Sequence, residues 1–169
     1  RQAPTVVTEG TGINWKQDFL LIAAALGTTE KAEKLMEEYT TKAKSVGQKA
    51  GTEKTFSFLY ASADRTRIFA KSSFVGSICQ DASLARPAAA QVEKTSIDLS
   101  SEQLDQADGD YLFYGVQGGD ESKLTGEALW STLKAVTEKR AHSVDSDMFF
   151  LNAGPAAALG VLETIEKAL

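Results

Sequence analysis

The chain contains 169 residues, of which 43% are hydrophobic, and its 23 acidic and 18 basic side chains give a formal net charge of −5. This length and apolar content are sufficient for one domain with a buried core. The acidic balance argues against binding to a nucleic-acid backbone, which needs a basic surface. No apolar run reaches the roughly 20 residues of a membrane-spanning helix, and the single cysteine, Cys79, excludes an internal disulfide.

Two predicted helices open the chain after a short β-branched segment. Thr5 to Thr8 predicts a strand or an extended connector, and Asn14 to Leu26 has apolar residues at helical spacing. Thr28 to Ala50 shows the clearest helical period, and Gly51 is expected to end that helix. Because charged residues fill its other face, we expect the rest of the chain to pack on its apolar stripe. The apolar stripes of the two helices carry, in turn, Trp15, Phe19, Ile22, Ala23 and Leu26, and then Ala32, Leu35, Met36, Tyr39, Ala43, Val46 and Ala50.

The middle of the chain predicts a β-hairpin followed by a helix. Thr55 to Ala61 and Arg67 to Ala70 are rich in strand-forming residues and are separated by a turn-like segment, ASADR. Ser73 to Asp81 then returns to helical spacing. A polar connector is expected over Ala88 to Ser96.

The last third of the chain again places strands before helices. Ser100 and Gln103 have the spacing of a capping box, so a short helix is expected to begin there. The remaining predicted elements are a strand over Asp110 to Val116, a loop over Gln117 to Thr125, a helix over Gly126 to Arg140, a strand over Ala141 to Val144 and a helix over Pro155 to Leu169. The recurring order of strand and helix predicts an α/β fold in layers.

Candidate catalytic and metal-binding residues have structural explanations that we favour. His142 is the only histidine and has no partner at metal-ligand spacing. Cys79 lies on the apolar side of its predicted helix, where a buried thiol is expected. Asp105, Asp108 and Asp110 resemble half of a calcium loop but lack its later ligands and its closing glutamate. The stretch GVQGGDES lacks the lysine and the spacing of a phosphate-binding loop.

Four segments from residue 69 onward resemble one known family when they are read in order. They are FAKSSFVGSICQDASLARP, IDLSSEQLDQADGDYLFYG, LWSTLKAVTEKRAHSVDSDMFF and GPAAALGVLETIEKAL. Their succession resembles the C-terminal half of the solute-binding proteins that deliver iron-siderophore complexes to ABC importers. Upstream, APTVV followed by WKQDFLLIAAALGTTEKAEKLMEEY is similar to the family's entry into the long helix that joins its two lobes. The resemblance covers nearly the whole chain.

This resemblance implies a layered α/β lobe with a central, mostly parallel sheet, preceded by a long inter-lobe helix. Residues 1–27 would be a connector from a missing N-terminal lobe, residues 28–51 the inter-lobe helix and residues 52–169 the C-terminal lobe. Because the chain begins with RQAPTVV and no methionine, we expect a cut or cleaved form of a longer protein. The resemblance also implies export, as a cell-surface lipoprotein or in a periplasm, with the lipid anchor on the missing part.

The activity implied by the resemblance is binding rather than catalysis. The protein would capture a ferric siderophore and deliver it to a membrane permease, with no intrinsic cofactor, because the siderophore already saturates its iron. Phe149 matches an aromatic position before the family's final glycine-rich turn. The residues that would line the ligand cleft are Tyr60, Arg65, Arg67, Tyr114, Trp130, Phe149 and Phe150.

The implied ligand is a hydroxamate siderophore. Family members that bind hydroxamates often carry an arginine where this chain has Leu59-Tyr60, and either Arg65 or Arg67 compensates for that difference or the ligand is a different one. The scarcity of arginine in an acidic chain argues against a strongly anionic catecholate complex, whose charge needs several cations.

Glu102 is a second functional candidate, because SSEQL matches the stretch in which the family's glutamate docks onto arginines of the permease. An acidic residue in the first turn of a helix also interacts favourably with the helix dipole and needs no partner for that.

Two other classes of function stay open. One is a doubly wound α/β enzyme that acts on a nucleotide or flavin at the strand ends. The other is a partner-binding module without a small ligand, in which an exposed apolar face makes the isolated lobe dimerise.

Overall fold

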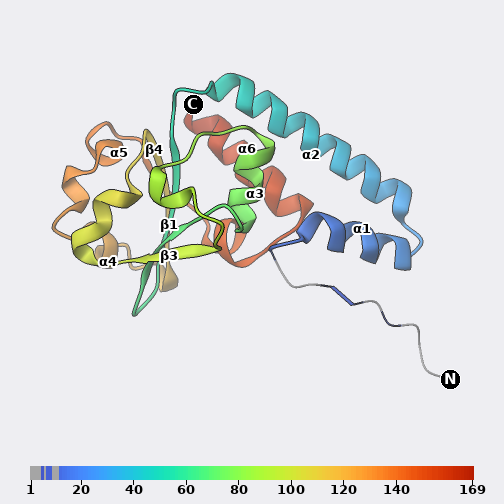
Figure 1. Cartoon of the computed structure of the whole chain (residues 1–169), viewed down its shortest axis with the longest axis horizontal. Coiled ribbons are helices and arrows are strands. Elements are labelled where there is room, and N and C mark those ends of the chain that lie inside the picture. Colours follow the sequence, from blue (N-terminus) through green and yellow to red (C-terminus); the bar gives the residue numbers. More distant parts are fainter. Residues whose placement is uncertain (1–4, 6, 9–11) are drawn as a thin grey trace.

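The fold is a five-stranded sheet with helices on both faces, seen in a computed structural model that describes residues 5, 7–8 and 12–169 (Figure 1). The strands are β1 (Phe56–Ala61), β2 (Thr66–Phe69), β3 (Ser96–Leu99), β4 (Tyr111–Val116) and β5 (Ala141–Ser143), in the order β3-β2-β1-β4-β5. The β1–β4 and β4–β5 pairs are parallel, whereas the β1–β2 and β2–β3 pairs are antiparallel. Because β2 alone among these strands runs against the others, the predicted mostly parallel α/β architecture is confirmed.

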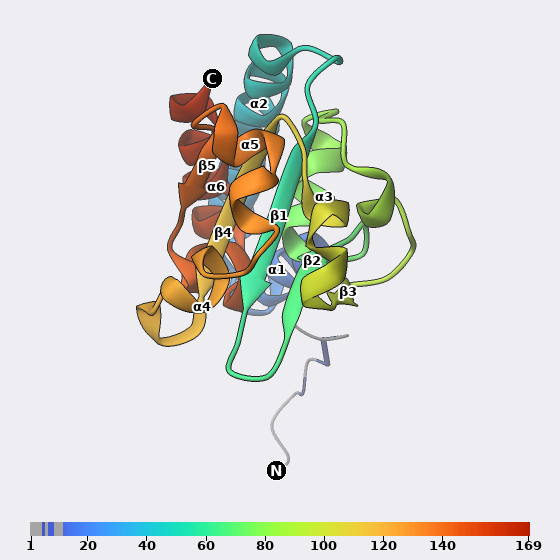
Figure 2. The ribbon, with the colours of Figure 1, turned by 90° about the vertical axis from the view of Figure 1, so that its left-hand side faces the viewer.

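The two faces of the sheet carry separate cores. Helices α1 (Trp15–Ala25), α2 (Thr29–Ala50), α3 (Phe74–Asp81) and α6 (Pro155–Ala168) cover one face, and α4 (Ser122–Thr125) and α5 (Lys134–Thr137) cover the other (Figure 2). We call these the α2 face and the α5 face. Every residue of β1 and β4 is buried, as expected for central strands that are covered on both sides.

Paired aromatic rings form the core of the α2 face. Alternate residues of β1 point to this face, and Phe56 lies opposite Tyr111 while Phe58 lies opposite Phe113 in the parallel register. The ring centroids of these two pairs are 5.1 and 5.5 Å apart, and both pairs are stacked. Such rings bury a large apolar area and fix the spacing of β1 and β4.

Helix α2 forms as its periodicity predicts, and five residues of its stripe are buried: Ala32, Tyr39, Ala43, Val46 and Ala50. A Cβ at Gly47 would lie 2.0 Å from the carbonyl oxygen of Ala82, so the end of α3 approaches α2 closely at this point. Helix α1 joins the same core through Trp15, whose indole donates a 2.9 Å hydrogen bond to Ser77 of α3. Both helices therefore pack on the α2 face, and the division into connector, inter-lobe helix and lobe stays a prediction.

The apolar stripe predicted for α1 is only partly buried. Trp15 and Ala23 are buried, but 45% of Ile22 and 71% of Leu26 is exposed. Helical spacing identifies the apolar side of this segment without saying what covers it, and Ile22 and Leu26 keep the spacing but remain exposed. The strand or connector predicted over Thr5 to Thr8 lies partly outside the described residues, and Thr5, Val7 and Thr8 belong to neither a helix nor a strand.

A predicted long helix over Gly126 to Arg140 is replaced by short pieces. The carboxylate of Asp108 accepts backbone hydrogen bonds from Lys134 at 2.6 Å and from Ala135 at 3.2 Å. Leu133 is extended, with φ −61° and ψ 135°, so α5 begins anew at Lys134. The Asp108 side chain, distant in sequence, caps this new helix. Helix α4 lies in what was predicted to be a loop.

The polar connector predicted over Ala88 to Ser96 also differs from the structure. It contains a short 3-10 helix over Ala88–Ala90 and leads into β3, an edge strand that the sequence pattern did not indicate. Strand β3 has only four residues, too few to show the alternation of apolar and polar residues that marks a longer strand. It is held in the sheet by its pairing with β2.

Candidate functional site

The candidate site lies at the carboxyl edge of the sheet, where β1 ends at Ala61 and the adjacent parallel strand β4 ends at Val116 (Figure 2). From β1 the chain turns toward β2, and from β4 it passes through α4 and α5 to β5 on the other side. Such a reversal of strand order leaves a crevice at the strand ends, where open α/β sheets bind ligands.

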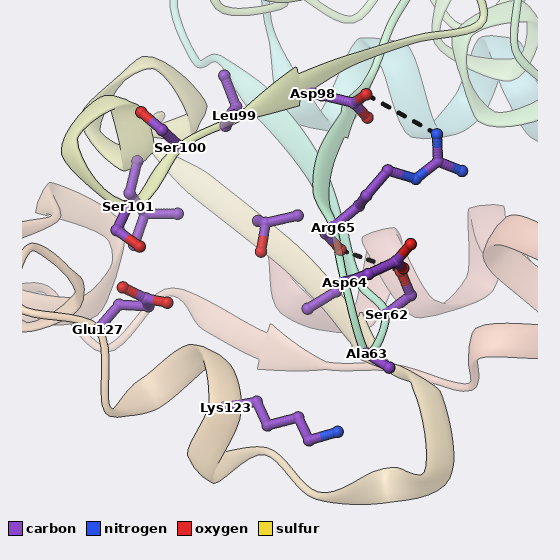
Figure 3. A pocket seen from close by; sticks show the side chains of 13 residues that line it. Ser62, Ala63, Asp64, Arg65, Asp98, Leu99, Ser100, Ser101, Lys123 and Glu127 are labelled. Atoms are coloured by element: carbon purple, nitrogen blue, oxygen red, sulfur yellow. Dashed lines mark hydrogen bonds and ion pairs between the residues drawn. The ribbon is translucent and has the colours of Figure 1, made fainter.

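A groove of about 680 Å³ opens at this edge on the α5 face. It is bounded by the β1–β2 turn, by the end of β3 with the following 3-10 helix over Ser101–Ala107, and by the segment that contains α4 (Figure 3). Its volume falls within the range of small-molecule sites. Its polar lining residues are Ser62, Asp64, Arg65, Thr66, Asp98, Ser100, Ser101, Lys123 and Glu127.

Acidic side chains outnumber basic ones in this groove. Its acidic lining residues are Asp64, Asp98 and Glu127, and its basic ones are Arg65 and Lys123. Arg65 already forms an ion pair with Asp98, with an Nη1 to Oδ2 distance of 3.8 Å (Figure 3). Both side chains are more than half exposed, so this pair contributes about 0–1 kcal/mol. The groove therefore favours neutral or cationic groups over anions.

On the α2 face of the same edge, a cation lies on a cluster of aromatic rings. Among the rows that point to the α2 face, the outermost one places Arg67 opposite Tyr60 and Tyr60 opposite Gly115. Phe150 covers this row, with its ring centroid 5.4 Å from that of Tyr60 and 5.0 Å from that of Phe69. We call Tyr60, Phe69 and Phe150 the aromatic wall.

The guanidinium of Arg67 completes the wall. Its Cζ lies 5.6 Å from the ring centroid of Tyr60 and 5.7 Å from that of Phe69, within the range of cation–π attraction. The Nε atom of Arg67 is buried and has no hydrogen-bond partner among the described residues. A buried donor without a partner is costly, and the attraction between the guanidinium and the two rings offsets part of that cost.

The structure thus brings together three of the seven predicted cleft residues, Tyr60, Arg67 and Phe150. Tyr60 is only 4% exposed and lies beneath the other two, whereas Phe150 and Arg67 are half-buried. Arg65 is exposed at the rim of the groove on the opposite face.

The other three predicted residues lie in the two cores. Phe149 is 1% exposed and packs against Phe58 and Phe113, with ring centroids 6.2 and 6.1 Å away. It belongs to a single π-helical turn, Asp147–Leu151, that sends Phe149 into the core and Phe150 toward the wall. Tyr114 and Trp130 are buried on the α5 face, in an edge-to-face contact of 4.9 Å. These three rings therefore present almost no surface to a ligand.

Glu121 holds the glycine-bearing segment after β4. Its carboxylate accepts a 3.0 Å hydrogen bond from the Tyr114 hydroxyl and a second from Ser143 at the end of β5. Burial and the neighbouring carboxylate raise the pKa of Tyr114 to about 12, so its hydroxyl stays protonated and donates at neutral pH. Sequence reasoning missed Glu121, because its two partners come together only in the folded sheet.

Other residues at the edge were missed for the same reason, although one left a signal. Glycine inside a strand often marks a place where another group approaches closely, and Gly115 lies against Phe150 and Ser146. The groove residues Ser62, Asp98 and Lys123 come from three separate segments, and nothing in their spacing indicates a common site.

Glu102 lies in the first turn of the 3-10 helix over Ser101–Ala107 and is exposed. The predicted start of this helix is confirmed, since the backbone N–H of Ser100 donates to the side-chain oxygen of Gln103 at 3.2 Å. The neighbouring Ser101 and Leu104 line the groove, so Glu102 lies beside the candidate site.

The candidate metal and nucleophile residues occupy structural positions. Burial raises the pKa of the Cys79 thiol, and burial also lowers the pKa of His142, which stacks on Phe113. Within residues 5, 7–8 and 12–169, no group of three His, Cys, Asp or Glu side chains is placed to hold a metal ion. Within the same residues, the helices are all too short or too polar to span a bilayer.

Three kinds of comparison connect this geometry with known proteins. Residues 1–148 match the sequence model of a family described as periplasmic binding protein. YfiY of Bacillus subtilis (strain 168), a probable siderophore-binding lipoprotein, is 31% identical over 97% of this chain and 56% of its own length. The iron(3+)-hydroxamate-binding protein FhuD of the same strain is 27% identical over 99% of this chain and 56% of its own length.

The crystal structure of Staphylococcus aureus SirA shares the fold. It superposes with a TM-score of 0.84 at 24% identity, covering 98% of this chain and 68% of that protein. The chain spans 56% of the length of the two curated relatives that it matches.

Proposed function

Since the chain belongs to the periplasmic binding protein family, we propose that it captures a ferric siderophore at the carboxyl edge of its sheet for an ABC importer. The observation that carries this proposal is the aromatic wall with Arg67 at the strand-order reversal. A ferric siderophore presents an organic shell around a saturated ion, and aromatic faces with a few polar donors suit such a ligand.

In this proposal the protein binds the organic shell and supplies no ligand to the iron. The half-buried Phe150 ring would contact the apolar part of the siderophore, and the guanidinium of the half-buried Arg67 would donate to one of its oxygens. Tyr60 would hold both groups in place from beneath, and Arg65 would reach the ligand from the rim of the groove. We give no direct ligand contact to the buried rings of Tyr114, Trp130 and Phe149.

The charge of the edge supports a hydroxamate siderophore as the ligand. Carboxylates of Asp64, Asp98 and Glu127 line the groove, and Glu121, Asp145 and Asp147 line a second hollow at the ends of β4 and β5. Arg65 and Lys123 are the basic residues that line the groove, and Arg65 is already paired with Asp98. A ferric tris-catecholate carries a high negative charge and would be repelled by this edge, whereas a ferric tris-hydroxamate is neutral.

The rest of the proposed pathway follows from the family. The chain would form the C-terminal lobe of a two-lobed exported protein, a cell-surface lipoprotein or a periplasmic protein. Glu102 would dock onto the permease, as the resemblance of SSEQL to the family implies. It is an exposed carboxylate beside the groove, and such a group steers a charged partner without contributing to ligand affinity. Glu102→Ala should therefore impair uptake and leave ligand affinity unchanged, and a loss of affinity would contradict this role.

Fluorescence titration tests the binding proposal. Trp15 and Trp130 give an intrinsic signal, and ferrioxamine-type, ferrichrome-type and ferric catecholate complexes would be titrated into the full gene product and into this chain. We expect saturable quenching by the hydroxamates and weaker binding by a single lobe. No response of the full gene product to any ferric chelate would refute the proposal.

Two variants locate the site. Phe150→Ala should raise the Kd for the hydroxamate by about 10-fold or more, which corresponds to ~1.4 kcal/mol. Arg67→Gln should act in the same direction, because it removes the guanidinium from the wall. Leu151→Ala is the matched control, since its side chain is adjacent in sequence and 55% exposed. Equal affinities in all three variants would move the site away from the wall.

The partner-binding alternative has one observation in its favour. The outer side of α1 exposes 44% of Leu21, 45% of Ile22 and 71% of Leu26, an apolar surface of the kind that marks interaction sites. As a second candidate, the isolated chain would self-associate through this side of α1. Ile22→Lys should then shift a dimer to monomer in sedimentation, whereas a monomeric wild-type chain would exclude this mode.

A further inference from the structure

We infer that Gly115 determines the ligand specificity of the aromatic wall by leaving the space that the Phe150 ring occupies; this inference rests on the proposed function. The sheet itself shows what is unusual at this position. In the rows below, β4 contributes Phe113 opposite Phe58 and Tyr111 opposite Phe56, so each row has two rings. In the outermost row Tyr60 lies opposite Gly115, and the second ring comes from Phe150 instead.

The space at Gly115 is filled by its neighbours. A Cβ at this position would lie 2.5 Å from Oγ of Ser146 and 2.9 and 3.2 Å from Cε2 and Cδ2 of Phe150. Favourable contacts between heavy atoms lie near 3.5–4.0 Å, so even a methyl group must displace the ring. The backbone of Gly115 does not have a positive φ, which means that space, and not backbone conformation, requires glycine.

The displaced ring has one direction in which to move. Tyr60 and Phe69 lie on the sheet side of Phe150 and are 4% and 7% exposed, so they cannot recede. Phe150 is half-buried and belongs to a five-residue turn, Asp147–Leu151, at the edge of the sheet. A side chain at position 115 would therefore push the ring away from the sheet, toward the side on which the proposed ligand would lie.

This displacement changes which ligands fit. A ring that projects further excludes a rigid, cyclic ferric hydroxamate of the ferrichrome type more than a flexible, linear one of the ferrioxamine type. It also changes the contacts of the ring with Tyr60 and Phe69, the two rings on which the Arg67 guanidinium lies. Gly115 is thus a positioning residue, which acts through Phe150 and does not itself contact the ligand.

The experiment compares Kd values for the two hydroxamate types in the full gene product. Gly115→Ala should raise the Kd for the ferrichrome type by about 10-fold and that for the ferrioxamine type by less, so that the ratio of the two changes. Gly115→Ala combined with Phe150→Leu should restore most of the original ratio, because the smaller side chain needs no displacement. Gly109→Ala is the control for an added methyl group far from the wall, since the nearest atoms to a Cβ there belong to Thr55, at 3.2 Å, and to Tyr111, at 3.5 Å, before the start of β4.

The outcomes distinguish a failure of the role of Gly115 from a failure of the proposed siderophore binding. An unchanged Kd ratio in Gly115→Ala, with wild-type binding intact, overturns the role of Gly115 and leaves the proposed function standing. Wild-type protein that binds neither complex overturns both. Should Gly115→Ala fail to fold, Phe150→Leu alone decides, because replacing the ring with a smaller side chain should shift the ratio in favour of the ferrichrome type, and no shift would overturn the inference.

Discussion

Asp110 offers a direct test of how the amino ends of β1 and β4 are held together. Its side chain is 11% exposed, and its two oxygens serve different partners. Oδ2 accepts from the backbone N–H and the hydroxyl of Thr55, at 2.9 and 3.1 Å, and Oδ1 accepts from Lys134 at 2.7 Å. Asp110→Asn keeps the shape of the side chain but leaves it only one acceptor oxygen. The amide nitrogen must then face either Thr55 or Lys134.

The expected loss follows from these contacts. Hydrogen bonds to a charged group contribute about 1.5–3 kcal/mol each, but Lys134 is 53% exposed, which places its share at the lower end. We therefore expect Asp110→Asn to lower the free energy of unfolding by about 2 kcal/mol at pH 7. The Lys134 ammonium and the Thr55 N–H hold the pKa of the Asp110 carboxyl below its ordinary value.

The lowered pKa of Asp110 also predicts how the stability difference between wild type and Asp110→Asn changes with pH. A carboxyl whose pKa is lower in the folded state stabilises the protein above its unfolded pKa, near 4, and this stabilisation is lost as the pH falls through the folded value. The difference between wild type and Asp110→Asn should thus be full at pH 7 and shrink below about pH 4. Urea denaturation over this pH range measures it, with the exposed Asp105→Asn as control. A difference below about 0.5 kcal/mol at pH 7 would refute the reasoning.

Two further predictions concern the α2 face. Gly47→Ala should lower the free energy of unfolding by about 2 kcal/mol, because the added methyl group collides with the Ala82 carbonyl. This loss outweighs the ~1 kcal/mol by which alanine favours an isolated helix. A denaturation midpoint equal to or above that of the wild type would contradict the packing of α2 on α3. Burial lowers the pKa of His142, so the unfolded chain binds more protons as the pH falls below about 6.5, and stability should decline there. His142→Gln should flatten the stability profile between about pH 7 and pH 5, and a profile as steep as that of the wild type would exclude this contribution.

Several elements were predictable because their signals are local. The helical period over Thr28 to Ala50 gave helix α2 within one residue, and Pro155 marked the start of α6. Ser73 was placed at the start of its helix, where its hydroxyl accepts from the N–H of Gly76 at 2.9 Å. Periodicity, caps and turns act over a few residues, so they can be read without knowing the rest of the fold.

Elements that depend on a distant partner were missed. The break before Lys134 is made by Asp108, which is remote in sequence, and β3 exists because it pairs with β2. The acidic cluster that resembles half a calcium loop is divided in the structure, where Asp108 caps α5 and Asp110 supports Thr55. Sequence spacing showed that these carboxylates lie close together, but their partners come from the tertiary structure.

The same division holds for the candidate site. The sequence by itself determined an α/β fold and a hairpin that carries Arg65 and Arg67. It also showed that aromatic residues lie near the ends of the predicted strands. Only the tertiary structure decided that Phe149 enters the core while Phe150 joins Tyr60 and Arg67, and that Tyr114 faces the other side of the sheet. The physical reason is that the apolar character of a ring predicts burial against something, whereas its exposure depends on which neighbouring segment crosses the strand ends and covers it.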